Sequence, residues 1–420
     1  MGTRFDPERV HENQKEKEKE GEKSFGRPGF VEGGKKESAE RFNPVNFILP
    51  PVSIDFHPIN PTSMNARIPL LFVCLFLFLS SRAQHPDSIL LKNYRPVSIY
   101  KIPQSNIKKA AYPVIDMHSH DHKETDAAEW VKTMDSAGIQ KSVILTYTTG
   151  KALDSLIDKY KAYPDRFEIW CGFDYTGFGQ PGWSDRAVKE LVRCHQKGAK
   201  GVGELGDKGE GELYSDPVPG KGIHIDNPAL QPLLRKCAEL NMPISIHVAE
   251  DQWMYENPDS TNDGLLNAAK WHVNMNVPGK LGHDELLATL ERAATNNPKT
   301  TFIACHFANC CSDLNKLGAM FDRHPNLYAD IAARFGEVAP IPRTTAAFIT
   351  KYQDRLVYGT DMGLDSDTYQ ITFRILESAD EHFYAFDHFG YHWALHGLNL
   401  PKKQLQKLYH DNAAKILNRK

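Results

Sequence analysis

The sequence predicts an α/β protein that folds as a single (β/α)8 barrel, the TIM-barrel class. From about residue 113 onward, short apolar runs alternate with amphipathic stretches of helical periodicity, which is typical of a parallel sheet covered by helices. The apolar runs are continuous rather than alternating, as expected for strands buried on both faces. An open dinucleotide-binding sheet would need a glycine-rich turn after its first strand, and none follows here.

Eight strands can be counted, and most of them end in polar residues. The active sites of such barrels collect at the C-terminal ends of the strands, so the polar ends are where chemistry is expected. The predicted strands span residues 114–120, 141–148, 167–175, 200–206, 243–249, 301–308, 327–334 and 356–361.

Helices are expected where apolar residues recur every three to four positions between breakers. The clearest predicted helices span residues 228–241, 283–297, 344–355 and, at the end of the chain, 401–418. The longest insert, 251–282, predicts a lid or substrate-binding loop, with a disordered excursion as the alternative. The glycine-rich residues 209–222 predict a second loop at the same rim.

The first 63 residues differ in composition from the rest of the chain. They contain the charged run KEKEKEGEK (15–23), a stretch rich in Gly, Lys and Glu, and several prolines, with little that could form a core. This composition predicts a disordered segment.

Residues 64–83 have the pattern of a secretory signal peptide: Met64, one arginine, an apolar run and small residues up to Ala83. The apolar run of about 12 residues is too short to cross a bilayer as a helix, although a membrane anchor is the alternative. Because such a signal belongs at an N-terminus, we expect translation to start at Met64 and residues 1–63 to be an over-extended reading of the gene. Cleavage after Ala83 would give a secreted or periplasmic chain with an extended arm over 84–112 and no stable membrane insertion.

Five candidate metal ligands lie at the ends of four predicted strands. His118 and His120 end the first strand, and His247, His306 and Asp361 lie at the ends of the fifth, sixth and eighth. Alternation along a strand puts His118 and His120 on one face, about two rises of 3.3 Å apart, so that both can reach one cation. Ordinary hydrogen-bonded histidines are the alternative for each residue alone, but parallel strands bring all five to one rim.

Five short runs resemble those of the amidohydrolase superfamily, in particular its amidohydrolase-related (type 2) branch. They are IDMHSH (115–120), ISIHVAE (244–250), ACHFAN (304–309), YGTDMG (358–363) and the tail HDNAAKIL (410–417). The resemblance covers about residues 113–418 and implies a metal-dependent barrel enzyme. It does not imply one substrate, because this branch contains both hydrolases and nonoxidative decarboxylases.

The ligand types indicate which ion is expected and what each residue does. Three neutral imidazoles and a carboxylate suit a divalent cation, Zn²⁺ first, with Mn²⁺, Fe²⁺ or Co²⁺ as alternatives. We expect His118, His120, His247 and Asp361 to be ligands, and Asp361 also to take the proton of the attacking water and pass it to the leaving group. His306 is expected to bind a second metal, or to orient the water and polarise the substrate carbonyl.

Glu204, at the end of the fourth strand in GVGELGD (201–207), is a sixth candidate ligand. Many superfamily members have a carboxylated lysine that bridges two metals near this position, and some relatives have a glutamate in a similar context. Lys200 lies at the wrong end of the strand for that role. The resemblance therefore implies one or two ions, with a supporting carboxylate or an ion pair as the alternative for Glu204.

Three further residues are candidates for contact with a small-molecule substrate. Arg334, at the end of the seventh strand, is expected to bind a substrate carboxylate, with an ion pair to Glu337 as the alternative. Trp253 and Trp271 in the long insert predict aromatic contacts, with loop packing as the alternative. A formal net charge of −3 argues against a nucleic-acid partner, and assembly into a homo-oligomer is left open.

The sequence thus predicts a secreted metal-dependent hydrolase of amide or ester bonds that uses metal-activated water. A nonoxidative decarboxylase on the same barrel is the first alternative, and a catalytically silent ligand-binding barrel is the second. Glu204 favours hydrolysis because a second metal favours hydroxide chemistry. Asp361 argues against the silent barrel because a pure binder needs no proton shuttle.

Overall fold

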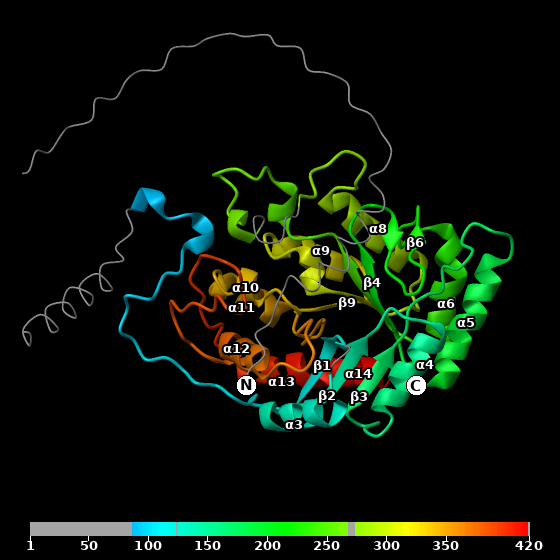
Figure 1. Ribbon diagram of the computed structural model, residues 1–420, viewed down its shortest axis with the longest axis horizontal. Coiled ribbons are helices and arrows are strands. Elements are labelled where there is room, and N and C mark those ends of the chain that lie inside the picture. The colour runs from blue at the N-terminus through cyan, green and yellow to red at the C-terminus, as the bar shows by residue number, and fades with distance from the viewer. Residues whose placement is uncertain (1–85, 123–124, 268–273, 419–420) are drawn as a thin grey trace, which may run out of the picture. The chain divides into compact units, whose positions relative to one another are not determined.

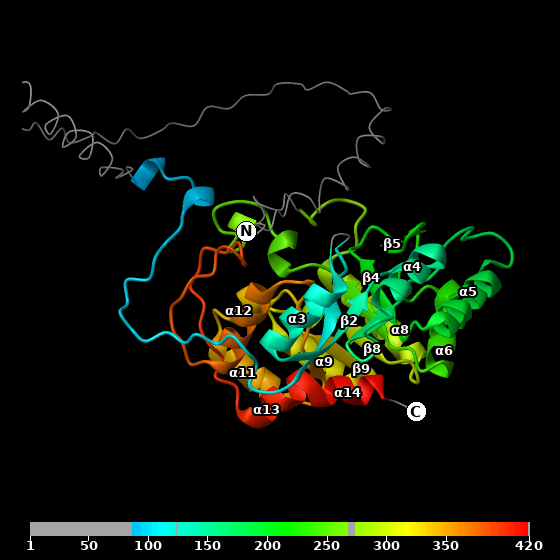
Figure 2. The ribbon, with the colours of Figure 1, turned by 60° about the horizontal axis from the view of Figure 1, so that its bottom comes forward.

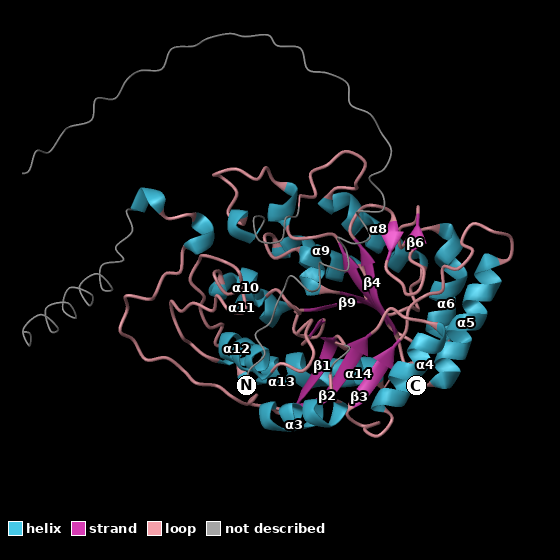
Figure 3. Cartoon of the chain, viewed as in Figure 1, coloured by secondary structure: helices cyan, strands magenta, loops and turns pink. Residues whose placement is uncertain are grey.

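The computed structural model describes residues 86–122, 125–267 and 274–418. In this part of the chain eight parallel strands stand inside a layer of helices, and the predicted (β/α)8 fold is confirmed (Figure 1; Figure 3). The strands are β1 (Val114–Ser119), β2 (Ile139–Leu145), β3 (Phe167–Trp170), β4 (Val202–Asp207), β7 (Ile244–Val248), β8 (Phe302–Ala304), β9 (Leu327–Asp330) and β10 (Leu356–Val357).

Backbone hydrogen bonds close the barrel at both places where the regular ladders stop. The ladders run β1-β2-β3 and β10-β9-β8-β7-β4. Between β1 and the end of β10, the Met117 N–H donates to the Tyr358 carbonyl at 2.9 Å, and between β3 and β4 the Cys171 N–H donates to the Gly201 carbonyl at 2.9 Å. Closure brings the C-terminal ends of all eight strands around one opening.

Several strands end earlier than predicted. β3, β8, β9 and β10 stop four or five residues before the ends of the predicted runs. Beyond the ends of β7, β8 and β10 the backbone takes left-handed conformations, with φ of 64° at Ala249, 61° at His306 and 64° at Asp361. The polar ends of these runs leave the ladder and turn across the barrel opening.

The helices predicted from periodicity are present. The interval 228–241 holds the short helix η3 (Pro228–Leu230) and α6 (Gln231–Glu239), and the tail holds α13 (Lys402–Gln406), the π-helical turn η6 (Lys407–Asp411) and α14 (Asn412–Leu417). The other α-helices of the described residues are α3 (Ala127–Ala137), α4 (Gly150–Tyr160), α5 (Trp183–Lys197), α8 (His283–Asn296), α9 (Leu314–Arg323), α10 (Phe335–Val338), α11 (Pro342–Lys351) and α12 (Ser366–Glu377).

The tail of the chain is bonded to the barrel. The Tyr358 N–H, just after β10, donates to the Leu408 carbonyl in η6 at 2.9 Å. Figure 2 shows α13 and α14 in red below the strands, so the tail lies on the side of the barrel away from the strand ends that carry the predicted ligands.

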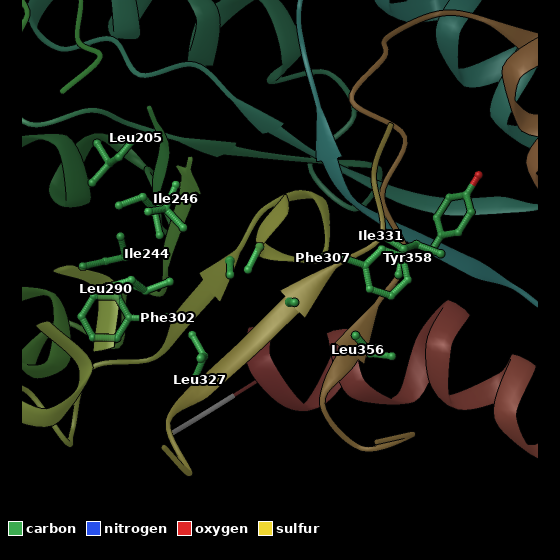
Figure 4. Close-up of a cluster of buried hydrophobic side chains, with 14 of the residues drawn as sticks. Leu205, Ile244, Ile246, Leu290, Phe302, Phe307, Leu327, Ile331, Leu356 and Tyr358 are labelled. Atoms are coloured by element: carbon green, nitrogen blue, oxygen red, sulfur yellow. The ribbon is translucent and has the colours of Figure 1, made fainter. Parts of the chain in front are cut away.

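Buried apolar side chains fill the space between the strands and the helices (Figure 4). Ile244, Ile246 and Phe302 on β7 and β8 are fully buried, together with Leu290 of α8, which packs in the same cluster. Burying one such side chain contributes roughly 1.5–3 kcal/mol, so this packing holds the strands in register below the opening.

Three segments lie outside the barrel strands and the helices that cover them. The arm contains η1 (Pro86–Ser88) and η2 (Leu91–Asn93), and the Ser105 N–H donates to Asp380 Oδ2 at 2.8 Å. The long insert contains η4 (Gln252–Tyr255), and the rim loop 209–222 contains the hairpin β5 (Glu212–Leu213) and β6 (Gly220–Lys221).

The predictions for residues 1–63 and for the signal peptide at 64–83 lie outside the described residues. Among the residues that are described, no helix combines the length and apolar character needed to cross a bilayer.

Candidate metal centre

Three predicted ligands meet at the end of β1. The Nε2 atoms of His118 and His120 lie 3.2 Å apart, on the same face of the strand as alternation predicts. Asp361 Oδ1 lies 3.2 Å from His118 Nε2 and 3.0 Å from His120 Nε2. The Asp361 N–H donates to the His118 carbonyl at 2.8 Å, which fixes the left-handed turn that aims this carboxylate at the two rings.

Gly359 allows the segment after β10 to approach β1 this closely. A Cβ placed at Gly359 would lie 2.7 Å from the Cβ of His118 and 3.2 Å from that of Ala332, closer than side chains normally pack. Glycine at this position therefore lets Asp361 reach the histidine pair.

Glu204 lies between two groups of histidines. Its Oε2 atom is 3.5 Å from His120 Nε2 and 3.8 Å from His118 Nε2. Its Oε1 atom is 3.1 Å from His247 Nδ1 and 3.2 Å from His306 Nε2. All six predicted ligands are thus brought together, as two sets that share Glu204: His118, His120, Glu204 and Asp361, and Glu204, His247 and His306.

The ring nitrogens that face away from this cluster also have partners. Their partners are Asp330 Oδ2 for His118 Nδ1, the Leu145 carbonyl for His120 Nδ1 and the Ala332 carbonyl for His306 Nδ1, each at 2.9 Å, and Glu250 Oε2 for His247 Nε2 at 3.3 Å. A carbonyl only accepts, so the neutral rings of His120 and His306 carry their proton on Nδ1 and direct the Nε2 lone pair inward. Outer hydrogen bonds of this kind are typical of metal-binding histidines.

The electrostatics of the cluster favour bound positive charge. Burial would lower the pKa of His118, but Asp330 raises that pKa well above its usual value. Burial would also lower the pKa of His120, but the hydrogen bond to Asp361 helps to raise that pKa to about 9. Burial would raise the pKa of Glu204, but the protonated His118 ring holds it well below its usual range.

These shifts mean that the pocket binds protons strongly when no other cation is present, and a divalent ion competes for the same nitrogens. The donor set of imidazoles and carboxylates, with lone pairs aimed at common points, fits Zn²⁺ or a similar ion. The pKa of His306 is lowered by burial, so its inward Nε2 lone pair is free to bind at neutral pH.

Two residues of the site were not among the sequence candidates. Asp330 ends β9 and bonds His118, and Glu250 lies three residues after His247 and bonds its ring. Asp330 carries the same signal as the ligands, a polar residue at the end of an apolar run. The i,i+3 spacing of His247 and Glu250 gives no comparable signal, because their contact depends on the turn at Ala249.

The candidate substrate-binding residues have protein partners. Arg334 donates from Nε to Asn309 Oδ1 at 2.9 Å and lies 3.2 Å from Asp251 Oδ2. Glu337, the alternative ion-pair partner, accepts a hydrogen bond from Tyr391. The predicted contact between Arg334 and a substrate carboxylate stays a prediction.

The two tryptophans belong to the long insert. Trp253 lies half-buried in η4, with its ring against the backbone of Gly264 in the same insert. Trp271 lies outside the described residues. Their contact with substrate also stays a prediction.

A family model described as Amidohydrolase matches residues 103–419 of the chain. Among curated proteins there is no significant match. Solved structures that are similar to this chain include 2,6-dihydroxybenzoate decarboxylase from Rhizobium, with 15% identity, a TM-score of 0.46 and coverage of 73% of this chain and 98% of that chain.

Two others are similar at the same level. The 5-carboxyvanillate decarboxylase from Novosphingobium aromaticivorans, complexed with manganese, has 16% identity, a TM-score of 0.45 and coverage of 76% of this chain and 100% of that chain. The 4-oxalomesaconate hydratase from Rhodopseudomonas palustris has 15% identity, a TM-score of 0.42 and coverage of 72% and 95%.

Proposed function

Because this chain belongs to the amidohydrolase family of metal-dependent enzymes, we propose that it hydrolyses an amide or ester bond of a small molecule. The observation that carries the proposal is the position of Glu204, whose two oxygens face two different groups of histidines. A carboxylate in this position suits two cations on either side of it, and paired cations favour the activation of water.

The residues divide into two sets of ligands. His118, His120 and Asp361 would hold one cation and His247 and His306 the other, with Glu204 between them. Zn²⁺ suits these donors best, and Mn²⁺, Fe²⁺ and Co²⁺ are the alternatives. Bound there, the metal supplies the positive charge that lowers the pKa of a water molecule and polarises a carbonyl oxygen.

Asp361 is the residue that moves the proton. Its side chain is 31% exposed, more than that of any other member of the two ligand sets, so it borders both the histidines and the open end of the barrel. Asp361 takes the proton from the attacking water as the new C–O bond forms. It then delivers that proton to the departing nitrogen or oxygen as the C–N or C–O bond breaks.

The charges around the site suit a substrate that is neutral at the reacting carbonyl. Arg334 is paired with Asp251, and Lys208 forms an ion pair with Glu250. A substrate carboxylate would have to compete with Asp251 for Arg334, or with Glu250 for Lys208. The carbonyl group of an amide or ester carries no charge and needs no pairing with Arg334 or Lys208.

Export from the cytoplasm is part of the proposal and rests on the signal pattern of residues 64–83. Sequencing of the N-terminus of the native protein tests it. A first residue near Gln84 is expected, and a chain that starts upstream of Met64 would contradict it.

Metal content and turnover test the proposed chemistry. The full chain, dialysed without chelator, is expected to hold about two metal ions, and Glu204→Gln about one. The matched control is Glu168→Gln, which changes another glutamate on a barrel strand, one that accepts from Trp170 and pairs with Lys141. This control should keep the metal content of the wild type.

The loaded protein is then offered amides, esters and lactones in parallel with aromatic carboxylic acids. Hydrolysis of a member of the first group supports the proposal. Release of CO₂ from an acid without any hydrolysis would replace it with decarboxylation, and no turnover at full metal content would leave a ligand-binding barrel.

A further inference from the structure

We propose that Glu250 is a positioning residue of the metal centre, which holds the His247 ring so that Nδ1 rather than Nε2 faces Glu204. The inference rests on the proposed metal centre and goes beyond it by assigning the residue that sets the orientation of one ligand. His247 differs from the other three rings in the cluster, because its inward nitrogen is Nδ1, 3.1 Å from Glu204 Oε1. Its outward Nε2 lies 3.3 Å from Glu250 Oε2.

The neutral His247 ring has one N–H and lies between two carboxylates. A proton on Nδ1 would point at Glu204 and occupy the position of a metal bond. A proton on Nε2 points at Glu250 and leaves the Nδ1 lone pair inward, beside the inward Nε2 of His306. Glu250 thus has the role for His247 that the Ala332 carbonyl has for His306.

Glu250 itself is held in place from several directions. Its side chain is 7% exposed and forms an ion pair with Lys208, and Arg334 Nη2 lies 3.9 Å from its Oε2 atom. Its backbone N–H donates to the Tyr255 hydroxyl at 3.2 Å. These contacts satisfy the buried carboxylate and keep it from turning away from His247.

The loop that carries Glu250 is fixed as well. Asn309 Nδ2 donates to the carbonyls of Val248 and Ala249 at 3.1 Å each, and its Oδ1 atom accepts from Arg334. Arg334 and Asn309 therefore support the turn that returns Glu250 to the ring of His247.

Two substitutions separate position from charge. Glu250→Gln keeps the shape and removes the charge, whereas Glu250→Asp keeps the charge beside Lys208 and shortens the reach by one methylene group. The matched control is Glu291→Gln, because Glu291 also accepts from a histidine, His324 Nε2 at 3.0 Å, and from the cation of Arg323, but on a different part of the barrel.

Zinc affinity is measured by competition with a chelator, and the proton on the His247 ring is located by NMR of protein labelled with ¹⁵N-histidine. Glu250→Asp is expected to bind the more weakly held zinc ion about 10- to 100-fold less tightly than the wild type, because its shorter side chain no longer reaches His247 Nε2. Glu250→Gln should bind this ion more tightly than Glu250→Asp does, because its amide oxygen can still accept the Nε2 proton. The wild-type spectrum should show the His247 proton on Nε2, and Glu291→Gln should match the wild type in both measurements.

Wild-type affinity in both Glu250 variants would overturn the proposal, and so would a His247 proton on Nδ1 in the wild-type protein loaded with zinc. Loss of zinc affinity in Glu250→Gln but not in Glu250→Asp would overturn the positioning role and show that Glu250 acts through its negative charge. Should Glu250→Gln fail to fold, Glu250→Asp carries the test. Binding of a single ion by the wild type would contradict the two-ion function, while the position of the His247 proton would still decide the role of Glu250.

Discussion

Asp330 Oδ2 lies 2.9 Å from His118 Nδ1, although 212 residues separate the two in the chain. The other oxygen of Asp330 accepts the backbone N–H groups of His306 at 2.8 Å and Ala332 at 3.0 Å. Burial would raise the pKa of Asp330, but the protonated His118 ring beside it lowers that pKa below its usual value. One carboxylate therefore orients the ring of one ligand and the backbone of another.

Asp330→Asn should weaken zinc binding by about 10- to 100-fold. The amide can keep the two backbone bonds through its oxygen, but its NH₂ group then faces His118 Nδ1 and favours the tautomer with a proton on Nε2. Chelator competition measures the affinity, and circular dichroism checks that the barrel is intact. Unchanged zinc affinity in a folded variant would show that His118 needs no help from Asp330.

Asp361→Asn should abolish turnover while leaving the fold and most of the bound metal. The amide keeps the side-chain oxygen near His118 and His120 but cannot accept the proton of the attacking water. Elemental analysis and turnover of an identified substrate are measured on the same sample. Activity equal to that of the wild type would remove Asp361 from the mechanism.

Gly359→Ala should reduce both stability and zinc binding. Its new Cβ would lie 2.7 Å from the Cβ of His118, an atom that cannot move away as the end of a flexible chain can. Overpacking of this kind costs about 1–3 kcal/mol of the free energy of unfolding. Urea denaturation of the metal-free protein separates this cost from any loss of metal. A variant as stable as the wild type, with the same zinc affinity, would contradict the close packing.

Glu337 should make stability depend on pH. Burial, followed by the nearby Asp251, raises the pKa of Glu337 from 4.5 to about 8. Between these values the folded protein keeps a proton that the unfolded chain has released, so the free energy of unfolding falls as the pH rises through this window. The stabilisation that Glu337 contributes is complete below pH 4.5 and is lost above a pH of about 8.

The measurement is a series of urea denaturation curves from acidic to mildly alkaline pH. Glu337→Gln stays neutral throughout, so its stability should fall less with pH than that of the wild type. Glu381 is exposed, so Glu381→Gln should follow the wild-type curve. Parallel curves for the wild type and Glu337→Gln would show that Glu337 does not carry this dependence.

The positions of the six candidate ligands could be predicted from the sequence because each lies at the polar end of a buried run. Parallel strands in a closed barrel bring such ends to one opening whatever the details of packing. This geometry places His118 of β1 and Asp361, which follows β10, at neighbouring positions of the opening, and Gly359 then allows their close approach.

The direction of each ring could not be predicted in the same way. Whether a histidine uses Nδ1 or Nε2 depends on turns after the strands, such as those with φ of 64° at Ala249 and 61° at His306. Asp330 and Glu250 come to bond the rings of His118 and His247 only after the chain has made such turns. The length of the strands was overestimated for the same reason, because polar residues that turn across the opening no longer pair in the ladder.

The contacts that the site histidines make with distant parts of the chain also link metal binding to the completion of folding. The bond from His118 to Asp330 spans 212 residues, and that from His306 to Glu204 spans 102. Both ligand sets are complete only when the chain from His118 to Asp361, which runs from β1 to the turn after β10, has come together, so a cation recognises the closed barrel and not its parts. Free metal at a hundredfold excess over its dissociation constant would then stabilise the folded state by about 2.7 kcal/mol, all of it against opening of the whole barrel. A chain that retains its metal has therefore completed the barrel up to its last strand, β10.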